Sequence, residues 1–259
     1  MQRVVAITGA SAGIGRATAL RLTRDGARIV LCARRTYRLQ GAVDEIRASG
    51  GEAVAVTGDV TREADMTALV ARAIECFGRL DVMMCNAGFG VYGAADQISP
   101  SKVESMLAVN FTGTYLAARA ALAVLRRQRS GHVIIVSSIV GKRGVPFMGA
   151  YAATKFAQVG LAESMRAELR GTGTHVTLVY PISIRTEFFD VMTAQSGFAT
   201  TSHGPRQEAS AVADAISRAI DDPVPEVFAY RRGRLLGIVN AIAPGFTDRL
   251  VQRWGRKPI

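Results

Sequence analysis

The sequence is poor in the residues that build metal sites, disulfide frameworks and histidine-based catalysis. It has three cysteines and three histidines among 259 residues, and none of them stands at a metal-ligand spacing. Cys32 and Cys85 lie in apolar runs and are expected to be small core residues. Three cysteines cannot all pair, which favours a reducing cytoplasm. We therefore expect no metal site and no histidine base.

Long apolar runs and acidic residues are also scarce. No uninterrupted apolar run reaches the ~20 residues that span a bilayer. The first residues, MQRVVAITGAS, lead into an apolar strand and a glycine turn, so we expect no secretory signal and a cytoplasmic protein. With 32 basic and 21 acidic residues, the formal net charge is +11. This charge suits phosphate, an acidic carrier protein or a lipid surface. A nucleic-acid partner would rest on net charge alone and is not expected.

Short apolar runs alternate with helix-patterned segments along the whole chain. The runs are continuous and rich in β-branched residues, typical of strands covered on both faces, at 3–8, 28–33, 52–57, 81–85, 132–137, 175–180 and, more weakly, 226–230. Helical patterns separate them at 14–25, 36–48, 62–77, 101–128, 151–170 and 207–221. This order predicts an α/β fold: a Rossmann-type doubly wound parallel sheet of about seven strands with helices on both faces. We expect a single domain, 1–259, with a long irregular substrate loop at 182–205.

The first strand is followed by a glycine-rich turn, TGASAGIG, at 8–15. Gly9, Gly13 and Gly15 would let the backbone turn tightly and approach a pyrophosphate at the N-terminus of the next helix. An ordinary tight turn is the alternative. The position between a strand and an amphipathic helix favours dinucleotide binding.

The second strand ends in LCARR. Dinucleotide sites of this kind carry an acid there when the ribose 2′-hydroxyl is free, and a basic residue when it is phosphorylated. Ala33 occupies the expected acid position, and Arg34 and Arg35 can hold a phosphate. The alternative is a solvated basic loop. The pattern predicts that NADP(H) is preferred over NAD(H).

The stretch AYAATKFAQ at 150–158 places Tyr151 and Lys155 on one face of a helix, because four residues are about one turn. A nearby ammonium favours phenolate, so Lys155 is expected to lower the pKa of Tyr151 from its usual value near 10. Tyr151 could then serve as an acid or base. A surface pair without a catalytic role is the alternative for these two residues taken alone.

Several of these motifs together resemble the short-chain dehydrogenase/reductase family in order and spacing, over nearly the whole chain. They are TGASAGIG at 8–15, GDV at 58–60, CNAG at 85–88, Asn110, Ser138 in VSSIVG, and YAATK at 151–155. The resemblance implies carbonyl–alcohol interconversion by hydride transfer, with Tyr151 as the acid, Ser138 orienting the substrate oxygen and Lys155 holding the nicotinamide ribose. It also implies that the backbone of Asn110 binds a water in a proton relay to Lys155.

The resemblance further implies a set of cofactor-binding residues. Asp59 and Val60 would meet the adenine ring, and the segment 86–88 would line the cofactor. The complete expected set is Gly9, Ser11, Gly13, Ile14, Gly15, Arg34, Arg35, Asp59, Val60, Asn86, Ala87, Gly88, Tyr151, Lys155, Pro181, Ile184 and Thr186.

Two positions depart from the family pattern. Ile182 stands where a glycine usually follows Pro181, and isoleucine does not adopt a positive φ cheaply. Ala12 stands where many NADP-preferring relatives carry a basic residue, so the phosphate preference would depend on Arg34, with Arg35 and Ser11 as further candidates.

The segments 88–94, 139–149 and 182–205 are expected to line the substrate pocket. They are rich in apolar and aromatic residues, which predicts a lipophilic carbonyl or alcohol as substrate; the residues are Phe89, Tyr92, Phe147, Phe188, Phe189 and Met192. The alternative function is a nucleotide-binding regulator on the same fold without turnover. An intact serine–tyrosine–lysine set argues against that alternative.

The last 29 residues, 231–259, form a basic amphipathic extension. It has seven basic residues and one acid, a net charge of +6, and its pattern predicts two short helices broken at Pro244. On the second helix, Phe246, Leu250, Val251 and Trp254 fall on one side. Three alternatives remain: packing on the domain or a sister subunit, a flap beside the pocket, or peripheral contact with an anionic membrane. By resemblance, helices 101–128 and 151–170 would pair in a homodimer or homotetramer.

Overall fold

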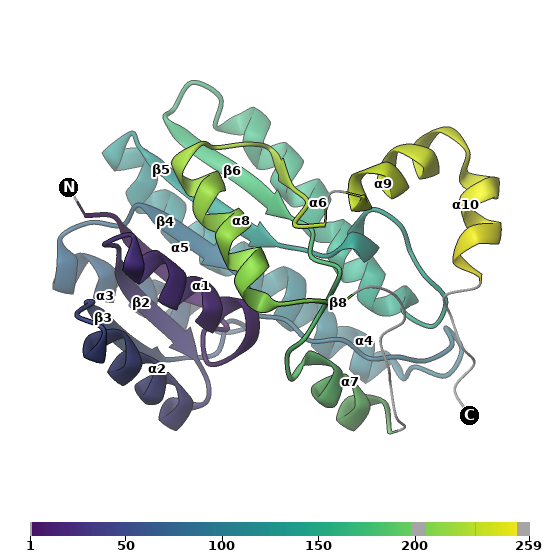
Figure 1. Ribbon diagram of the computed structural model, residues 1–259, viewed down its shortest axis with the longest axis horizontal. Coiled ribbons are helices and arrows are strands. Elements are labelled where there is room, and N and C mark those ends of the chain that lie inside the picture. Colours follow the sequence, from purple (N-terminus) through teal and green to yellow (C-terminus); the bar gives the residue numbers. More distant parts are fainter. Residues whose placement is uncertain (1, 198–205, 231, 253–259) are drawn as a thin grey trace.

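The computed structural model describes residues 2–197, 206–230 and 232–252 of the 259-residue chain. Its centre is a seven-stranded parallel sheet with strand order β3-β2-β1-β4-β5-β6-β9 (Figure 1). The strands are β1 (Val4–Thr8), β2 (Arg28–Ala33), β3 (Ala53–Thr57), β4 (Val82–Cys85), β5 (Gly131–Val136), β6 (Thr174–Val179) and β9 (Glu226–Val227). The predicted doubly wound fold is confirmed, although β9 is shorter than the run 226–230.

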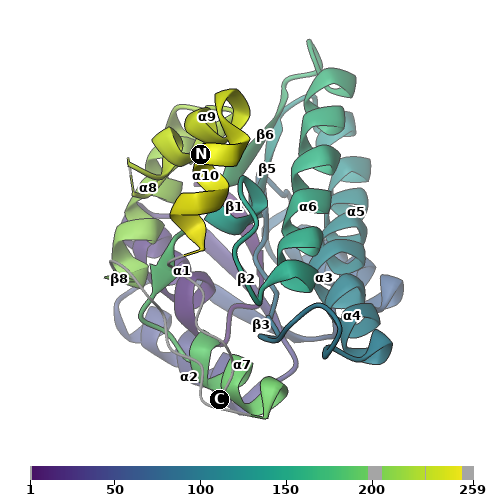
Figure 2. The same cartoon turned by 90° about the vertical axis from the view of Figure 1, so that its right-hand side faces the viewer.

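Helices cover both faces of the sheet, as Figure 2 shows from the side. One face carries α1 (Gly13–Arg24), α2 (Thr36–Ala48) and α8 (Ala209–Asp221), and the other carries α3 (Glu63–Phe77), α5 (Gly113–Gln128) and α6 (Gly149–Glu168). Alternate residues of one strand therefore enter different cores: Val5 and Ile7 join the first, Val4 and Ala6 the second. Burial on both sides explains why the strands read as continuous apolar runs.

The helix expected at 101–128 is not continuous. It consists of α4 (Pro100–Met106), a π-helical turn (Leu107–Thr112) and α5. A π turn leaves backbone carbonyls without the usual helical partner, and such turns are frequent at functional sites. By length and composition alone, Pro100–Gln128 could cross a membrane, a test that core helices of soluble proteins also pass.

The described part of the segment 182–205, residues 182–197, is more regular than expected. It begins with β7 (Ser183–Ile184), which pairs with β8 (Arg206–Gln207), and continues into helix α7 (Phe188–Ser196). The prediction of an irregular loop is wrong for these residues, because FFDVMTAQS can form a helix that packs its apolar side chains on the cavity. Ile182 is not among the described residues with positive φ, so the loop path accommodates it.

The C-terminal segment forms two helices broken at Pro244, as predicted: α9 (Gly233–Ile242) and α10 (Pro244–Val251). They stand beyond the sheet, in yellow at the right of Figure 1. Arg143 binds both helices: it donates a hydrogen bond to Asn240 Oδ1 on α9 at 2.9 Å, and it forms an ion pair with Asp248 on α10. Trp254 lies outside the described residues.

Candidate active site

A cavity of about 970 Å³ lies among the glycine turn, the β7–α7 segment and the C-terminal helices. It collects nearly all of the predicted site residues: Gly9, Ser11, Gly13, Ile14, Arg34, Arg35, Asp59, Val60, Asn86, Ala87, Gly88, Ser138, Tyr151, Lys155, Pro181, Ile184 and Thr186. Gly15 and Asn110 are not in its lining. Both lie directly behind the wall and support it.

The glycine turn has no room for side chains at Gly9 and Gly15, so its backbone can come close to a ligand. A Cβ atom at Gly9 would lie 2.8 Å from the Cα of Ala87, and one at Gly15 would lie 2.6 Å from the carbonyl oxygen of Gly9. Gly15 therefore serves close packing of α1 against the turn. Ala12 precedes α1 and gives it no side-chain cap, so the first N–H groups of α1 can meet an anion. The turn fits the diphosphate of a dinucleotide.

Asn86 joins the ends of β1 and β4 beneath this turn. Its Nδ2 donates to the carbonyls of Thr8 at 3.0 Å and Gly9 at 3.2 Å. The Thr8 hydroxyl in turn accepts from the backbone N–H groups of Asn86 and Ala87. These bonds fix the floor of the groove at the carboxyl ends of two neighbouring strands, where ligands bind in open α/β sheets.

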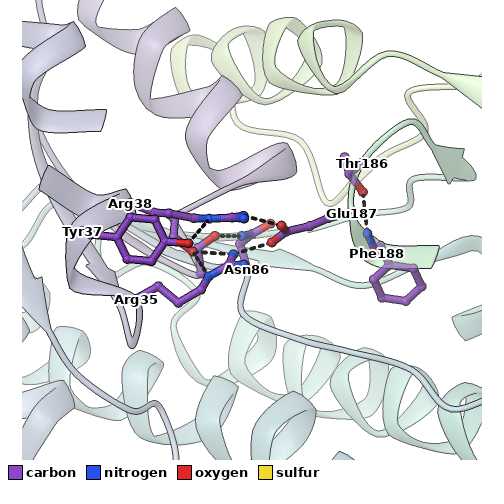
Figure 3. A network of polar contacts seen from close by, with 9 residues as sticks. Arg35, Tyr37, Arg38, Asn86, Thr186, Glu187 and Phe188 are labelled. Carbon is purple, nitrogen blue, oxygen red and sulfur yellow. Dashed lines mark hydrogen bonds and ion pairs between the residues drawn. The ribbon is translucent and has the colours of Figure 1, made fainter. Parts of the chain in front are cut away.

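One end of the groove carries a cluster of charges around Arg34, Arg35 and Asp59, where the sequence predicts the adenosine of a dinucleotide. We call it the adenosine end. Arg35 donates to Ser11 Oγ at 2.9 Å through Nη2, and it also pairs with Glu187. Figure 3 shows the Glu187 carboxylate between Arg35 and Arg38. The hydrogen bond from Arg35 is the main reason that the pKa of Glu187 lies below its usual value. Arg34 is exposed and lines the same cavity, near Asp59.

The catalytic candidates meet at the opposite end of the cavity. Tyr151 and Ser138 share a side-chain hydrogen bond, and Lys155 Nζ lies 5.7 Å from the centroid of the Tyr151 ring. Tyr151 and Lys155 are 6% and 3% exposed. Ser137 points away from this group and donates to the carbonyl of Lys155 at 3.2 Å, as strand alternation predicts.

The expected lowering of the Tyr151 pKa is wrong for this arrangement. Burial raises the pKa of Tyr151, and the hydrogen bond with Ser138 only partly opposes that effect. Burial also lowers the pKa of Lys155 to about 7. The physical reason is the direction of the ammonium: Lys155 Nζ donates to the carbonyl of Val136 at 3.0 Å and to Gln158 Oε1 at 3.1 Å.

The comparisons with known proteins agree with this geometry. The short chain dehydrogenase family model matches residues 3–197. An uncharacterized oxidoreductase of Listeria monocytogenes is 36% identical over 85% of this chain and 91% of its own length. This chain belongs to the short-chain dehydrogenase/reductase family.

Two solved structures extend the likeness to the cofactor. A short-chain dehydrogenase/reductase from Burkholderia phymatum in complex with NAD has a TM-score of 0.86 at 25% identity, over 95% of both chains. An alcohol dehydrogenase from Thermococcus sibiricus complexed with 5-hydroxy-NADP has a TM-score of 0.78 at 27% identity, over 88% of this chain and 96% of its own. A nicotinamide dinucleotide fits this short-chain dehydrogenase/reductase. One of the two similar structures holds NAD and the other holds 5-hydroxy-NADP.

Asn110 departs from the role that the family resemblance implies. Its side chain is wholly buried and exchanges hydrogen bonds with the backbone of Phe89, accepting from N at 3.0 Å and donating to O at 2.9 Å. Its backbone carbonyl, freed by the π turn, accepts from Gln158 Nε2 and from the Thr114 hydroxyl. A carbonyl has two lone pairs, so this one is saturated by side chains instead of a relay water.

The end of the cavity around Tyr151 is the catalytic end and the expected substrate end. It is lined by aromatic and aliphatic side chains. Tyr151 contacts the ring of Phe188, with centroids 5.6 Å apart, and Phe89, Tyr92, Phe189 and Met192 join the lining as expected. Phe147 does not line the cavity. Its backbone has φ 63°, and its ring packs on Tyr92 at 5.7 Å.

Sequence reasoning missed part of this wall and two polar residues. The C-terminal helices contribute Leu235, Leu236, Val239, Phe246 and Leu250 to the lining. Within the described residues, α9 and α10 therefore lie beside the pocket, as one of the three alternatives predicts. Val251, expected on the same side as Leu250, is buried. Gln158 and Glu187 also went unnoticed; only the spacing of Gln158, three residues after Lys155 on one helix face, carried a signal.

Proposed function

We propose that this protein is an NADP(H)-dependent oxidoreductase that interconverts a carbonyl and a secondary alcohol. The observation that carries the proposal is a single cavity with two chemically distinct ends. One end holds Ser138, Tyr151 and Lys155, and the other holds the glycine turn with Arg34 and Arg35. A hydride donor and a proton donor can therefore meet one substrate between them.

The cofactor, when bound, supplies or accepts the hydride. In reduction, the Ser138 hydroxyl orients the carbonyl oxygen, and Tyr151 donates its phenolic proton to that oxygen as the hydride reaches the carbon. The C=O π bond is lost, an O–H and a C–H bond form, and Tyr151 is left as phenolate. Burial keeps the phenol protonated, which suits this direction. Lys155 stabilises the phenolate and would hold the ribose next to the nicotinamide.

The preference for the phosphorylated cofactor is supported by three features of the adenosine end. Ala33 supplies no carboxylate for a free ribose hydroxyl, and Arg34 is an exposed cation that lines the cavity. Arg35 and Arg38 already bind one carboxylate together, that of Glu187. Guanidinium groups bind phosphate with paired hydrogen bonds.

A lipophilic substrate is supported by the lining of the substrate end. Phe188, Met192 and Val140 stand near the catalytic group, and the C-terminal helices add Leu236 and Phe246. Apolar walls with a few convergent polar groups are typical of sites for small apolar ligands.

Assembly as a homodimer or homotetramer is supported by apolar side chains on the outer face of the π turn, α5 and α6. Leu107, Tyr115 and Phe156 are 38%, 44% and 46% exposed there. Figure 2 shows α5 and α6 side by side on the outside of the molecule. Light scattering should give two or four times 27.6 kDa at micromolar concentration, and a value of 27.6 kDa would refute the assembly.

We place the protein in the cytoplasm, with peripheral contact to an anionic membrane as a second location. Ile238 and Ile242 on α9 are 46% and 79% exposed, beside the exposed Arg234. Such a mixed surface suits the boundary of an anionic bilayer. Sedimentation with anionic vesicles at low salt checks this, and a chain truncated after Tyr230 should stay in the supernatant.

A screen of carbonyl and alcohol substrates tests the proposed function. NADPH or NADP⁺ absorbance is followed with the wild-type protein and with Tyr151→Phe. Turnover by the wild type alone, with several apolar carbonyls, supports the proposal. Binding of the cofactor without turnover of any carbonyl or alcohol would favour a regulatory protein.

A further inference from the structure

Gln158 on α6 forms a direct bridge between Lys155 and the π turn. Its side chain is wholly buried. The amide oxygen accepts a hydrogen bond from Lys155 Nζ at 3.1 Å. The amide nitrogen donates to the carbonyl of Asn110 at 2.6 Å and to the Thr114 hydroxyl at 2.8 Å. Two helices and the catalytic lysine are thus joined through one side chain.

The hydrogen bonds of this bridge are almost fully used. Both amide protons of Gln158 have acceptors, and the Asn110 carbonyl receives a second bond from the Thr114 hydroxyl at 2.7 Å. Lys155 Nζ has three protons; two point to Val136 O and Gln158 Oε1. The third remains for the cavity, which Lys155 lines.

We propose that Gln158 is a positioning residue that aims the Lys155 ammonium into the cavity and stabilises its charged form. The inference rests on the proposed catalytic role of Lys155. A primary amide has no proton that titrates in the ordinary pH range, so Gln158 holds Lys155 without passing protons toward Asn110. Proton exchange by Lys155 is then confined to the cavity side.

The surroundings of Lys155 offer few groups that stabilise its ammonium, so the hydrogen bond to Gln158 matters for its protonation. Burial lowers the pKa of Lys155 to about 7, and no carboxylate is among its described partners. Tyr151 is the titratable group that faces it from α6. From the sheet, Cys85 donates to the carbonyl of Thr114 at 3.7 Å, and burial raises its pKa to about 12, so it stays neutral. The charged form therefore depends on neutral acceptors, of which Gln158 is one.

A glutamine that only fills the core would predict something different. Its removal would lower stability and leave the protonation of Lys155 unchanged. The two interpretations are separated by measuring the pKa of Lys155 directly, by NMR of protein labelled with ¹³C at lysine Cε. The chain has only four lysines, Lys102, Lys142, Lys155 and Lys257, and Lys155→Arg assigns the signal.

The variants are Gln158→Met, which removes the acceptor at similar length, and Gln158→Glu, which keeps an oxygen acceptor in either protonation state. The matched control is Gln128→Met, because Gln128 also binds a backbone far from the site, donating to the carbonyl of Leu80 at 2.6 Å. Loss of a hydrogen bond to a charged group typically shifts a pKa by about one unit or more.

We expect Gln158→Met to lower the pKa of Lys155 by about one unit, Gln158→Glu to hold it at or above the wild-type value, and the control to leave it unchanged. The Lys155-dependent limb of the pH–rate profile should move in the same direction, with kcat affected more than KM.

An unchanged Lys155 pKa in folded Gln158→Met overturns the inference, as does a value below wild type in Gln158→Glu. The second variant decides the matter if the first does not fold. The titration needs no substrate, so failure of the bridge is distinguishable from failure of the proposed function, which would appear as absent turnover in the wild-type protein.

Discussion

The two ends of the cavity hold their polar groups by different means. At the catalytic end, Asn110, Lys155 and Gln158 are buried and joined by hydrogen bonds of 2.6 to 3.1 Å, with no carboxylate among their described partners. At the adenosine end, Arg35 and Glu187 are 39% and 30% exposed in their side chains and are held by charge. Both ends are polar, but only the catalytic end buries its polar side chains.

This difference bears on what each end can do. A buried network is costly to leave incomplete, so it fixes geometry and is insensitive to salt. Ion pairs near the surface contribute little to stability and are screened by salt, so their partners are easily exchanged. The catalytic end is thus suited to hold one arrangement, and the adenosine end is suited to trade its carboxylate for a phosphate.

The largest expected effect is at the catalytic end. Tyr151→Phe removes one hydroxyl and leaves the ring that packs against Phe188. Because a positioned acid usually contributes ~10²–10⁴-fold, turnover should fall at least a hundredfold while the Kd for NADP⁺ stays nearly the same. Steady-state rates and cofactor titration measure the two quantities. Retention of more than about a tenth of the activity would remove Tyr151 from its role.

The next effect is on stability. Asn110→Ala leaves the backbone N–H and carbonyl of Phe89 without their partner and opens space in a buried site. We expect the free energy of unfolding to fall by about 2–4 kcal/mol, because unsatisfied buried polar groups and cavities both cost. Urea unfolding measures it. A loss no larger than that of an exposed change such as Gln40→Ala would contradict the view of a tightly coupled network.

Much of this architecture could be predicted from the sequence because the signals are local. Continuous apolar runs predict buried parallel strands, and spacing along one helix places Tyr151 beside Lys155. The rest depends on folding. Only the π turn brings the Asn110 carbonyl to Gln158, and Glu187 meets Arg35 across 152 residues of sequence. Neither contact leaves a periodic pattern, and the cavity wall formed by α9 and α10 depends on where the chain returns.

At the adenosine end, Arg35→Ala should weaken binding of NADP⁺ by about ten- to hundredfold, because hydrogen bonds between charged groups are worth about 1.5–3 kcal/mol. Binding of NAD⁺ should change little, and the wild-type advantage for NADP⁺ should shrink as salt rises. Fluorescence titration at two salt concentrations checks both. Arg72→Ala is the control, since Arg72 pairs with Glu75 on α3. Equal losses for both cofactors would mean that Arg35 does not read the phosphate.

The smallest effect should come from the competing carboxylate. Glu187 occupies Arg35 and Arg38, so a 2′-phosphate that binds Arg35 must displace or share it. Glu187→Gln removes the negative charge at nearly the same size. We expect NADP⁺ to bind about two- to tenfold more tightly and NAD⁺ to bind about as before, the range set by half-exposed ion pairs. Glu208→Gln is the control, because Glu208 pairs with Arg185 and is exposed. If Glu187→Gln instead weakens NADP⁺ binding, the carboxylate assists the phosphate site, and the adenosine end holds its arrangement as firmly as the catalytic end.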